Sequence, residues 1–303
     1  MDRLDAMSIL VAAVEAGSLS AAARRLSVPL ATVSRKVAEL EAHLKTRLLV
    51  RSRQRLALTD AGAGYLAACR RILEEVDEAE RAAAGEYSAP RGELIVSAPI
   101  VFGRLHVLPL VIDFLAAYAD IAVRLPLADH VINLLEEHVD VAVRIGALPD
   151  SSLTAIRVGA IRRIICASPA YLDAHGAPQA PGDLAAHACI AYEGLSGATW
   201  TFTRGKRETS VAIRARLVVN TAEAAVDAAV AGVGIIRVLS YQAAQALRDG
   251  RLALALTDWE PEPWPVHLVH AGGRLLPLKL RAFLDFAAPR LRTRLAQLAD
   301  ISA

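Results

Sequence analysis

Residues 32 to 36 place several hydrogen-bond donors close together, near the start of a predicted helix. Thr32, Ser34, Arg35 and Lys36 lie within five consecutive positions. A guanidinium group pairs bidentately with guanine, so Arg35 is the predicted base reader, and hydroxyl groups such as those of Thr32 and Ser34 also reach base edges. We assign Lys36 to phosphate contact. The alternative is that some of these side chains only solvate the surface, but the pattern favours contact with nucleic acid.

A second basic group lies between two short apolar segments. The segments are 48–50 and 56–58, and the tip between them reads Arg-Ser-Arg-Gln-Arg. Extended segments that flank a basic tip are typical of a β-wing. The sequence therefore predicts that Arg51 and Arg53 contact a phosphate backbone or a minor groove.

Three predicted helices position these side chains. Apolar residues at helical spacing run from Leu4 until Gly17, and Ser18 or Ser20 is placed to cap a short second helix that ends near Leu26. After a break, a third helix is expected over residues 30–44. Two helices joined by a short turn, with a polar and basic start on the second, are what reading of the major groove requires.

The charge distribution supports this interpretation. The formal net charge of the chain is only +2, but bases outnumber acids over residues 1–58. The bases there are Arg3, Arg24, Arg25, Arg35, Lys36, Lys45, Arg47, Arg51, Arg53 and Arg55, and the acids are Asp2, Asp5, Glu15, Glu39 and Glu41. A basic head on a nearly neutral chain is the electrostatic pattern of a nucleic-acid-binding module.

A long helix is expected next, with Thr59 as its N-cap and a linker at 88–92. Apolar residues follow a heptad seam interrupted by Glu80. The seam consists of Leu66, Cys69, Leu73, Val76 and Ala83. Such a seam favours pairing with a second copy of the chain. The alternative is a helix that packs on its own domain.

From Glu93 onward, predicted strands alternate with amphipathic helices. The expected elements are strands at 94–96, 121–127 and 139–144, helices at 103–118 and 131–137, a less regular repeat over 161–256, a last strand at 266–270 and a last helix at 277–295. This order predicts a parallel sheet with helices on both faces. We expect a winged helix-turn-helix domain (1–58), a linker helix and hinge (59–90) and a two-lobed α/β domain (91–303), with lobe I at 91–160 and 266–303 and lobe II at 161–265.

Polar residues follow predicted strands at three connections of this α/β domain. The connections are Ser97-Ala98-Pro99-Ile100, Asp129-His130 and Asn220-Thr221-Ala222. Unpaired N–H groups at a helix start suit a small anion such as a carboxylate, and ligands of open α/β sheets lie at the carboxyl ends of the strands. The predicted ligand contacts are Ser97, Pro99, Ile100, Asp129, Asn220 and Thr221. The alternative is that the polar side chains only cap their own helices.

Two further residues belong to this set of candidates. Arg144 either clamps an anionic ligand or holds Asp140 and the neighbouring backbone, and we favour the structural role. Ser196 lies in a glycine-containing loop that has the composition of a cleft edge but equally that of an ordinary turn.

Other classes of protein are disfavoured. The segment Gly194–Ala198 lacks the last glycine of a serine-hydrolase elbow, and Gly232-Val233-Gly234 lacks the third glycine of a dinucleotide fingerprint. We therefore expect no catalytic residues, no metal and no cofactor. Cys166 and Cys189 are interpreted as inert buried thiols rather than a redox pair. We find no apolar run long enough for a membrane span and no secretion signal, which favours a reducing cytoplasm.

Many of these motifs, in this order, resemble LysR-type transcriptional regulators. The motifs are Ala21-Ala22-Ala23 with Leu26, Thr32–Val37, Leu40-Glu41, Arg47–Arg51, Leu58–Gly62, Ser97-Ala98-Pro99, Asp140–Gly146, and Asn220 with Ala231–Ile235. The chain departs from the family at Lys45, where a glycine usually closes the recognition helix, and at Pro29, where a polar residue is usual.

The resemblance implies a regulator that binds operator DNA as a homodimer or homotetramer through the linker helix. It also implies a small-molecule effector in a cleft like that of periplasmic binding proteins, and a changed operator geometry or RNA polymerase contact in response. The competing hypothesis is a solute-binding module without regulatory DNA contact. The basic head and the heptad helix argue against that hypothesis, because a transport protein needs neither.

Overall fold

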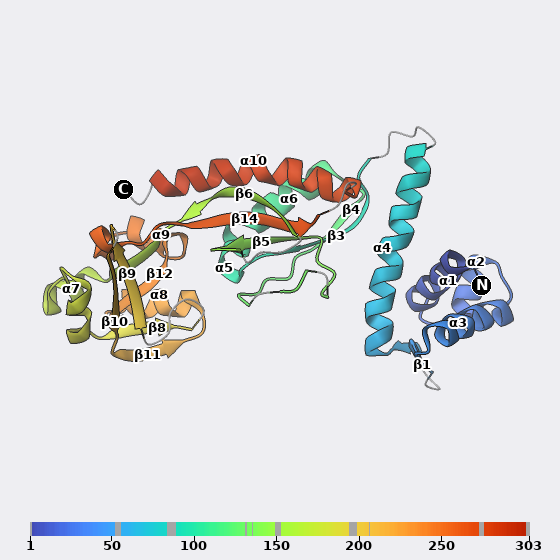
Figure 1. Cartoon of the computed structure of the whole chain (residues 1–303), viewed down its shortest axis with the longest axis horizontal. Coiled ribbons are helices and arrows are strands. Elements are labelled where there is room, and N and C mark those ends of the chain that lie inside the picture. Colours follow the sequence, from blue (N-terminus) through green and yellow to red (C-terminus); the bar gives the residue numbers. More distant parts are fainter. Residues whose placement is uncertain are drawn as a thin grey trace. The chain divides into compact units, whose positions relative to one another are not determined.

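The computed structural model describes residues 2–51, 56–83, 89–130, 132–134, 136–148, 153–193, 199–205, 207–272 and 276–300. The chain divides into two compact units, Met1–Gly92 and Glu93–Ala303. Figure 1 shows helices and a two-stranded wing in the first unit, and two sheets with their helices in the second.

The first unit is a winged helix-turn-helix with a long helix attached. Helices α1 (Arg3–Glu15), α2 (Leu19–Leu26) and α3 (Leu30–Leu44) pack around a buried core, β1 (Leu49–Arg51) pairs antiparallel with β2 (Leu56–Leu58), and α4 (Asp60–Ala83) follows. Of the two candidate caps, Ser18 is the N-cap of α2, because its Oγ accepts from the Ala21 N–H at 3.1 Å. The predicted helix-turn-helix is confirmed.

Local hydrogen bonds fix the wing to α3. The Glu41 carboxylate accepts the N–H groups of Leu48 and Leu49 at 2.8 and 3.0 Å, and the Thr59 hydroxyl caps α4 through the Gly62 N–H at 2.9 Å. A Cβ at Gly62 would lie 2.0 Å from the Leu48 carbonyl oxygen, so only glycine allows the first turn of α4 this close to the wing. Lys45 ends α3 with φ 54°, the left-handed turn for which glycine is usual.

The first half of the heptad seam on α4 packs inside its own unit. Leu66 and Cys69 are 5% and 0% exposed in the core of the first unit, and Leu73 packs against that core. The interpretation that these residues face a second copy is therefore wrong, and the alternative of a helix packed on its own domain holds for them. The reason is that α1 packs directly on α4, so the seam residues complete the winged-helix core.

Lobe I of the second unit contains a mixed sheet of five strands. Their order is β4 (Ile121–Arg124), β3 (Gly92–Ser97), β5 (Val141–Ile145), β14 (Trp264–Ala271) and β6 (Leu153–Ile161). Strands β3 and β5 are parallel, whereas β14 is antiparallel to both β5 and β6. The predicted parallel sheet is therefore a mixed sheet, because the returning chain inserts β14 antiparallel between two earlier strands.

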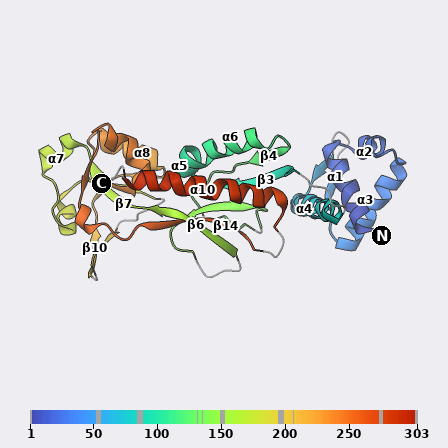
Figure 2. The ribbon, with the colours of Figure 1, turned by 90° about the horizontal axis from the view of Figure 1, so that it is seen from above.

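Helices cover one face of this sheet. A continuous helical run of α5 (Ile100–Phe102), a π-helical turn (Gly103–Val107) and α6 (Leu108–Ala117) packs beside α10 (Leu278–Asp300), as Figure 2 shows. Residues 132–134 and 136–139 cover the opposite face without any helix. The helix expected at 131–137 is therefore absent from the described part of that segment, and helices on both faces are not found in lobe I.

The run Ile100–Ala117 also corrects the expectation about membrane spans. Its length of 18 residues and mean hydropathy of 1.8 are enough to cross a bilayer by length and composition alone. However, 44% of the run is buried inside the structure, and Phe114 on it packs edge-on against Phe283 of α10 with ring centroids 5.2 Å apart. The run is thus a core helix of lobe I.

Lobe II contains a second mixed sheet of five strands. Their order is β11 (Ala215–Val219), β8 (Cys189–Tyr192), β12 (Ile235–Leu239), β7 (Arg163–Ala167) and β13 (Ala253–Ala255). Helices α8 (Ala222–Val230) and α9 (Ser240–Arg248) pack on one face. The other face is covered by α7 (Pro169–His175) and by the hairpin of β9 (Thr199–Arg204) and β10 (Arg207–Ala212). Helices on both faces are thus found in lobe II.

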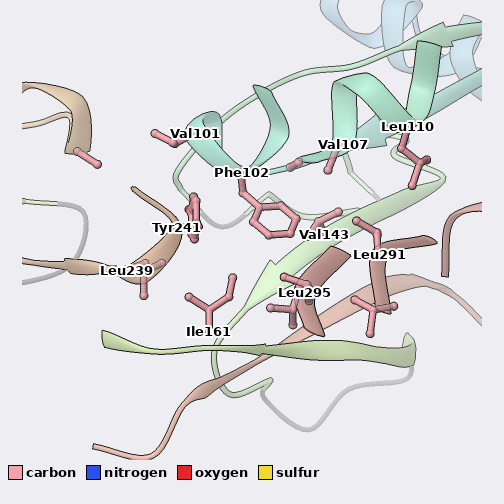
Figure 3. Packing of buried hydrophobic residues seen from close by; sticks show 14 of the residues in the cluster. Val101, Phe102, Val107, Leu110, Val143, Ile161, Leu239, Tyr241, Leu291 and Leu295 are labelled. Carbon is pink, nitrogen blue, oxygen red and sulfur yellow. The ribbon is translucent and has the colours of Figure 1, made fainter. Parts of the chain in front are cut away.

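A shared hydrophobic core joins the two lobes. In Figure 3 the ring of Phe102 lies between Tyr241 of lobe II and Val143 of lobe I. The rings of Phe102 and Tyr241 meet edge to face, with their centroids 5.4 Å apart. The start of the helix at Ile100 is therefore packed directly against lobe II.

Candidate DNA-binding and effector sites

The N-terminal half of α3 forms an exposed surface. Arg35 and Leu30 are exposed, whereas Thr32 and Ser34 are half-buried. Val33, Val37 and Leu40 face the core with no exposed surface. The hydrophobic stripe therefore leaves the predicted readers on the outer side of the helix.

The start of α3 has no side-chain cap. Pro29 is the N-cap, with φ −59° and ψ 141°, and it offers only its carbonyl, which accepts from Thr32 N–H at 2.9 Å. Among the described residues, no side-chain oxygen caps the first two N–H groups, those of Leu30 and Ala31. Such a helix start suits an anion, and in a DNA-binding helix a phosphate group.

The two adjacent bases of α3 have different surroundings. Arg35 forms an ion pair with Glu39 at 2.7 Å and keeps 60% of its side chain exposed. Lys36 forms an ion pair with Asp5 of α1 at 2.6 Å and is only 16% exposed. An exposed pair contributes at most about 1 kcal/mol, so Arg35 exchanges partners at little cost, whereas Lys36 is held against α1.

The structure describes little of the basic tip of the wing. Arg51 ends β1, where it pairs with Leu56, and Arg53 lies outside the described residues.

The start of the helix at Ile100 is occupied by a side chain of the protein itself. Ala98 forms a parallel bridge with Leu127, which brings the segments after β3 and β4 together. As a result, the Asp129 carboxylate accepts the Ile100 N–H at 3.0 Å. Tyr192, at the end of β8 in lobe II, donates its hydroxyl to the other oxygen of Asp129 at 3.1 Å. Burial and the negative charge of Asp129 raise the pKa of Tyr192, so this hydroxyl remains a donor.

Ser97 lies next to this arrangement at the end of β3. It is 1% exposed, and its Oγ has no hydrogen-bond partner within the described part of the chain. Pro99 is the N-cap of α5 and has no side chain that could cap it. The structure thus joins Asp129 to the segment Ser97–Ile100, which contains the other predicted residues Ser97, Pro99 and Ile100.

A second polar contact joins the two lobes near this point. Arg104 of lobe I and Glu223 of α8 form an ion pair at 3.6 Å. The sequence analysis missed Tyr192, Arg104 and Glu223. Tyr192 carried a usable signal, because it ends the apolar segment Cys189-Ile190-Ala191-Tyr192, for which no separate strand was predicted; the other two lie within helices and carried none.

The remaining candidates have mainly local roles. Thr221 caps α8 by accepting the Ala224 N–H at 3.3 Å, as the capping alternative predicted, and Asn220 beside it is exposed. Arg144 donates to the Ile132 carbonyl at 2.5 Å, which agrees with the favoured structural role. Ser196 lies outside the described residues.

Both units match models of known families. The lysR family of bacterial regulatory helix-turn-helix proteins matches residues 4–63, and the LysR substrate binding domain matches residues 88–292. Two relatives are an HTH-type transcriptional regulator of Xanthomonas campestris pv. campestris (36% identical, 93% of this chain and 84% of the relative) and the HTH-type transcriptional activator AaeR of Escherichia coli (30% identical, 94% and 93%).

Two solved full-length structures share the fold. CrgA, a LysR-type transcriptional regulator from Neisseria meningitidis, is 31% identical with a TM-score of 0.60, covering 95% of this chain and 98% of its own. The Vibrio cholerae virulence activator AphB is 28% identical with a TM-score of 0.60, covering 94% and 98%. The alternative of a solute-binding module without DNA contact and the alternative of an enzyme are thereby excluded. The chain belongs to the LysR family of DNA-binding transcriptional regulators, with a winged helix-turn-helix and a two-lobed effector-binding domain.

Proposed function

We propose that this regulator reads its operator with the exposed start of α3 and that a small carboxylate controls it by displacing Asp129. The observation that carries the DNA half of the proposal is the start of α3. That helix of 15 residues begins without a side-chain cap and presents an arginine that is 60% exposed.

Each DNA contact has an assigned role. Thr32, Ser34 and Arg35 contact base edges, with Arg35 pairing to a guanine. Lys36, Arg51 and Arg53 contact phosphate groups or the minor groove. Because Lys36 is already paired with Asp5, its contribution to affinity should be smaller than that of Arg35.

Fluorescence anisotropy tests the DNA half, with the intergenic DNA beside the gene as the target and random DNA as competitor. Arg35→Ala should weaken specific binding about 10- to 100-fold, the loss of one bidentate base contact. Arg25→Ala is the matched control, because Arg25 is also 60% exposed and pairs with a glutamate, Glu15, at 3.0 Å. This control should change binding less than about threefold and equally for both DNAs.

Equal losses in the two variants would refute the assignment of Arg35 as a base reader. Binding that random DNA competes away completely would refute sequence-specific reading by this surface.

The effector half rests on the contacts of Asp129. Its carboxylate is exposed and bonds both Ile100 N–H and Tyr192 OH, so an incoming carboxylate could take over both donors. The unpartnered hydroxyl of Ser97 adds a third donor. Asn220, Thr221, Arg144 and Ser196 are proposed as further contacts of the effector.

A thermal-shift screen of small carboxylic acids tests the effector half, with hits carried into the anisotropy assay. Asp129→Asn should bind a hit more tightly than the wild type, because the competing charge is gone while the shape is kept. A hit that binds Asp129→Asn less tightly than the wild type would show that Asp129 is itself a contact of the effector rather than its competitor.

The partners follow from the family. We propose a homodimer or homotetramer joined through the part of α4 beyond Leu73, acting in the cytoplasm and contacting RNA polymerase. Light scattering of the purified chain measures the assembly, and a monomer at micromolar concentration would contradict it.

A further inference from the structure

Two arginines on the sheet of lobe II lie side by side, with no counter-ion among the residues that the structure describes. In the antiparallel register of β7 and β12, Arg163 pairs with Leu239 and Ile165 pairs with Arg237. Arg163 and Arg237 are therefore diagonal neighbours on one face of the sheet, since side chains two apart on a strand share a face. This is the face of Ile165 and Trp200, opposite to α8 and α9.

Both guanidinium groups are withdrawn from water. Arg237 is 8% exposed and Arg163 is half-buried, and neither forms an ion pair within the described part of the chain. The neighbouring Arg162 shows the usual solution, with two hydrogen bonds to Glu260 at 2.7 and 2.8 Å. Burial and the nearby charge of Arg163 lower the pKa of Arg237 to about 10. An unpaired buried charge is costly, so such pairs are rarely left without an anion.

The groups around the two arginines satisfy the guanidinium N–H donors only in part. Arg163 lies over the ring of Trp264 at 4.4 Å and Arg237 over the ring of Trp200 at 5.5 Å. Arg237 donates one bond, to the Thr201 carbonyl at 3.2 Å. The Nε atoms of both arginines and the indole Nε1 of the fully buried Trp200 have no acceptor in the described structure. Three unsatisfied N–H groups with two positive charges therefore lack an acceptor of negative charge.

We propose that Arg163, Arg237 and Trp200 form a binding site for a small oxyanion of the sulfate or phosphate class. A doubly charged oxyanion would balance both guanidinium charges and accept the unsatisfied N–H groups. Arg163, which is only half-buried, is the side from which the anion enters. The site is separate from the effector site at Ile100, because it lies on the opposite face of the lobe II sheet.

Inorganic sulfate tests the proposal on the full-length protein, in thermal unfolding and tryptophan fluorescence at constant ionic strength set with chloride. We expect millimolar sulfate to raise the Tm by about 3 °C or more and to change the emission of Trp200. Phosphate and acetate in parallel separate an inorganic dianion from a ligand that carries a carboxylate.

Two variants separate a binding site from a structural contact. Arg163→Gln should lower sulfate affinity at least tenfold, while its Tm without sulfate stays the same or rises because a like charge beside Arg237 is gone. Arg204→Gln is the matched control, since Arg204 also lies over an indole ring, that of Trp259 at 5.1 Å, but is exposed. It should keep the full response to sulfate, including any general salting effect.

A sulfate response that is equal in the wild type and in Arg163→Gln would overturn the proposal. If Arg163 has only a structural role, Arg163→Gln should have a lower Tm without sulfate and should still respond to sulfate as the wild type does. That combination would also overturn the proposal. Because neither measurement involves DNA or the effector, failure here leaves the proposed function untouched.

Discussion

Two helices of this protein begin with the same backbone conformation but differ in the side chains that lie at their first turns. Pro29 begins α3 with φ −59° and ψ 141°, and Pro99 begins α5 with φ −57° and ψ 145°; neither helix has a cap from its N-cap side chain. At α3 the first N–H groups receive no side-chain oxygen from the part of the chain that the structure describes, whereas at α5 the Ile100 N–H donates to Asp129. The local backbone is equivalent, so only the tertiary partner differs.

The difference indicates how each helix start can act. The start of α3 can gain a partner only from outside the chain, which suits a surface that binds phosphate. The start of α5 already holds a carboxylate that also bonds lobe II through Tyr192. A ligand there must exchange with Asp129, and the exchange would alter a contact between the lobes.

The seventh residue of each helix, counted from Leu30 in α3 and from Ile100 in the run that begins with α5, is a basic residue. Lys36 of α3 has the Asp5 carboxylate at 2.6 Å. His106, in the run from Ile100, is 7% exposed and has no partner for either ring nitrogen among the described residues. Its ring packs against both Phe102 and Tyr241, with centroids 4.9 and 5.6 Å away.

The largest effect is therefore expected at His106. Burial, with a smaller contribution from the charge of Arg294, lowers the pKa of His106 from 6.5 to about 4. Between these values the unfolded chain binds a proton that the folded chain does not. The contribution of His106 to the free energy of unfolding is thus fully present above pH 6.5. It falls by about 3 kcal/mol as the pH drops to 4.

Urea unfolding of the wild type and of His106→Phe over that pH range measures this effect. The free energy of unfolding of His106→Phe should lose most of its dependence on pH. The control variant His130→Asn, which changes an exposed histidine, should keep the pH dependence of the wild type. A wild-type slope that persists in His106→Phe would place the responsible group elsewhere.

Asp129→Ala should have the next largest effect. The variant removes the carboxylate that caps Ile100 and leaves the hydroxyl of the buried Tyr192 without its acceptor. Each loss costs about 1 kcal/mol, so we expect the free energy of unfolding to fall by about 2 kcal/mol. Asp120→Ala, an exposed acid in the same lobe, controls for the change of charge. Equal stability of the two variants would mean that Asp129 does not hold this helix start.

These helix starts also show which parts of the structure could be predicted from the sequence. The bounds of α3, Leu30–Leu44, follow from apolar spacing and a break at Pro29, which are local signals. The left-handed turn at Lys45 could likewise be expected from the glycine usual at that position. The alternation of apolar strands and amphipathic helices after Glu93 predicted the two α/β lobes, and the resemblance to a family supported them, because its motifs lie in order along the whole chain.

The features that were missed depend on segments far apart in the sequence. Strand β14 enters the sheet of lobe I between β5 and β6, and no periodicity within 264–271 encodes that position. Asp129 reaches Ile100 only because Ala98 pairs with Leu127. Thr221 carried a local capping signal, and its capping role was among the expected alternatives. The sequence therefore indicated which residues stand at helix starts but not which partner fills each start.

The smallest expected effect tests the open helix start itself. Pro29→Ser supplies a hydroxyl that can accept an N–H of the first turn, which stabilises a helix by about 1 kcal/mol. Loss of the rigid proline ring offsets about 0.4 to 1 kcal/mol of this gain through the unfolded chain. The net change in unfolding free energy should therefore stay below about 0.6 kcal/mol.

Amide hydrogen exchange of Ala31 measures this change directly, with Thr32 as the internal reference. The Ala31 amide should exchange more slowly in Pro29→Ser if the start of α3 is open in the wild type, because a cap then fills a vacant position, whereas the Thr32 N–H already donates to the carbonyl of residue 29. Unchanged exchange together with a loss of stability above 1 kcal/mol would mean that Pro29 already closes this start by packing. In that case neither helix start would have an open N–H group in the folded protein. The phosphate contact proposed for α3 would then have to come from its side chains alone.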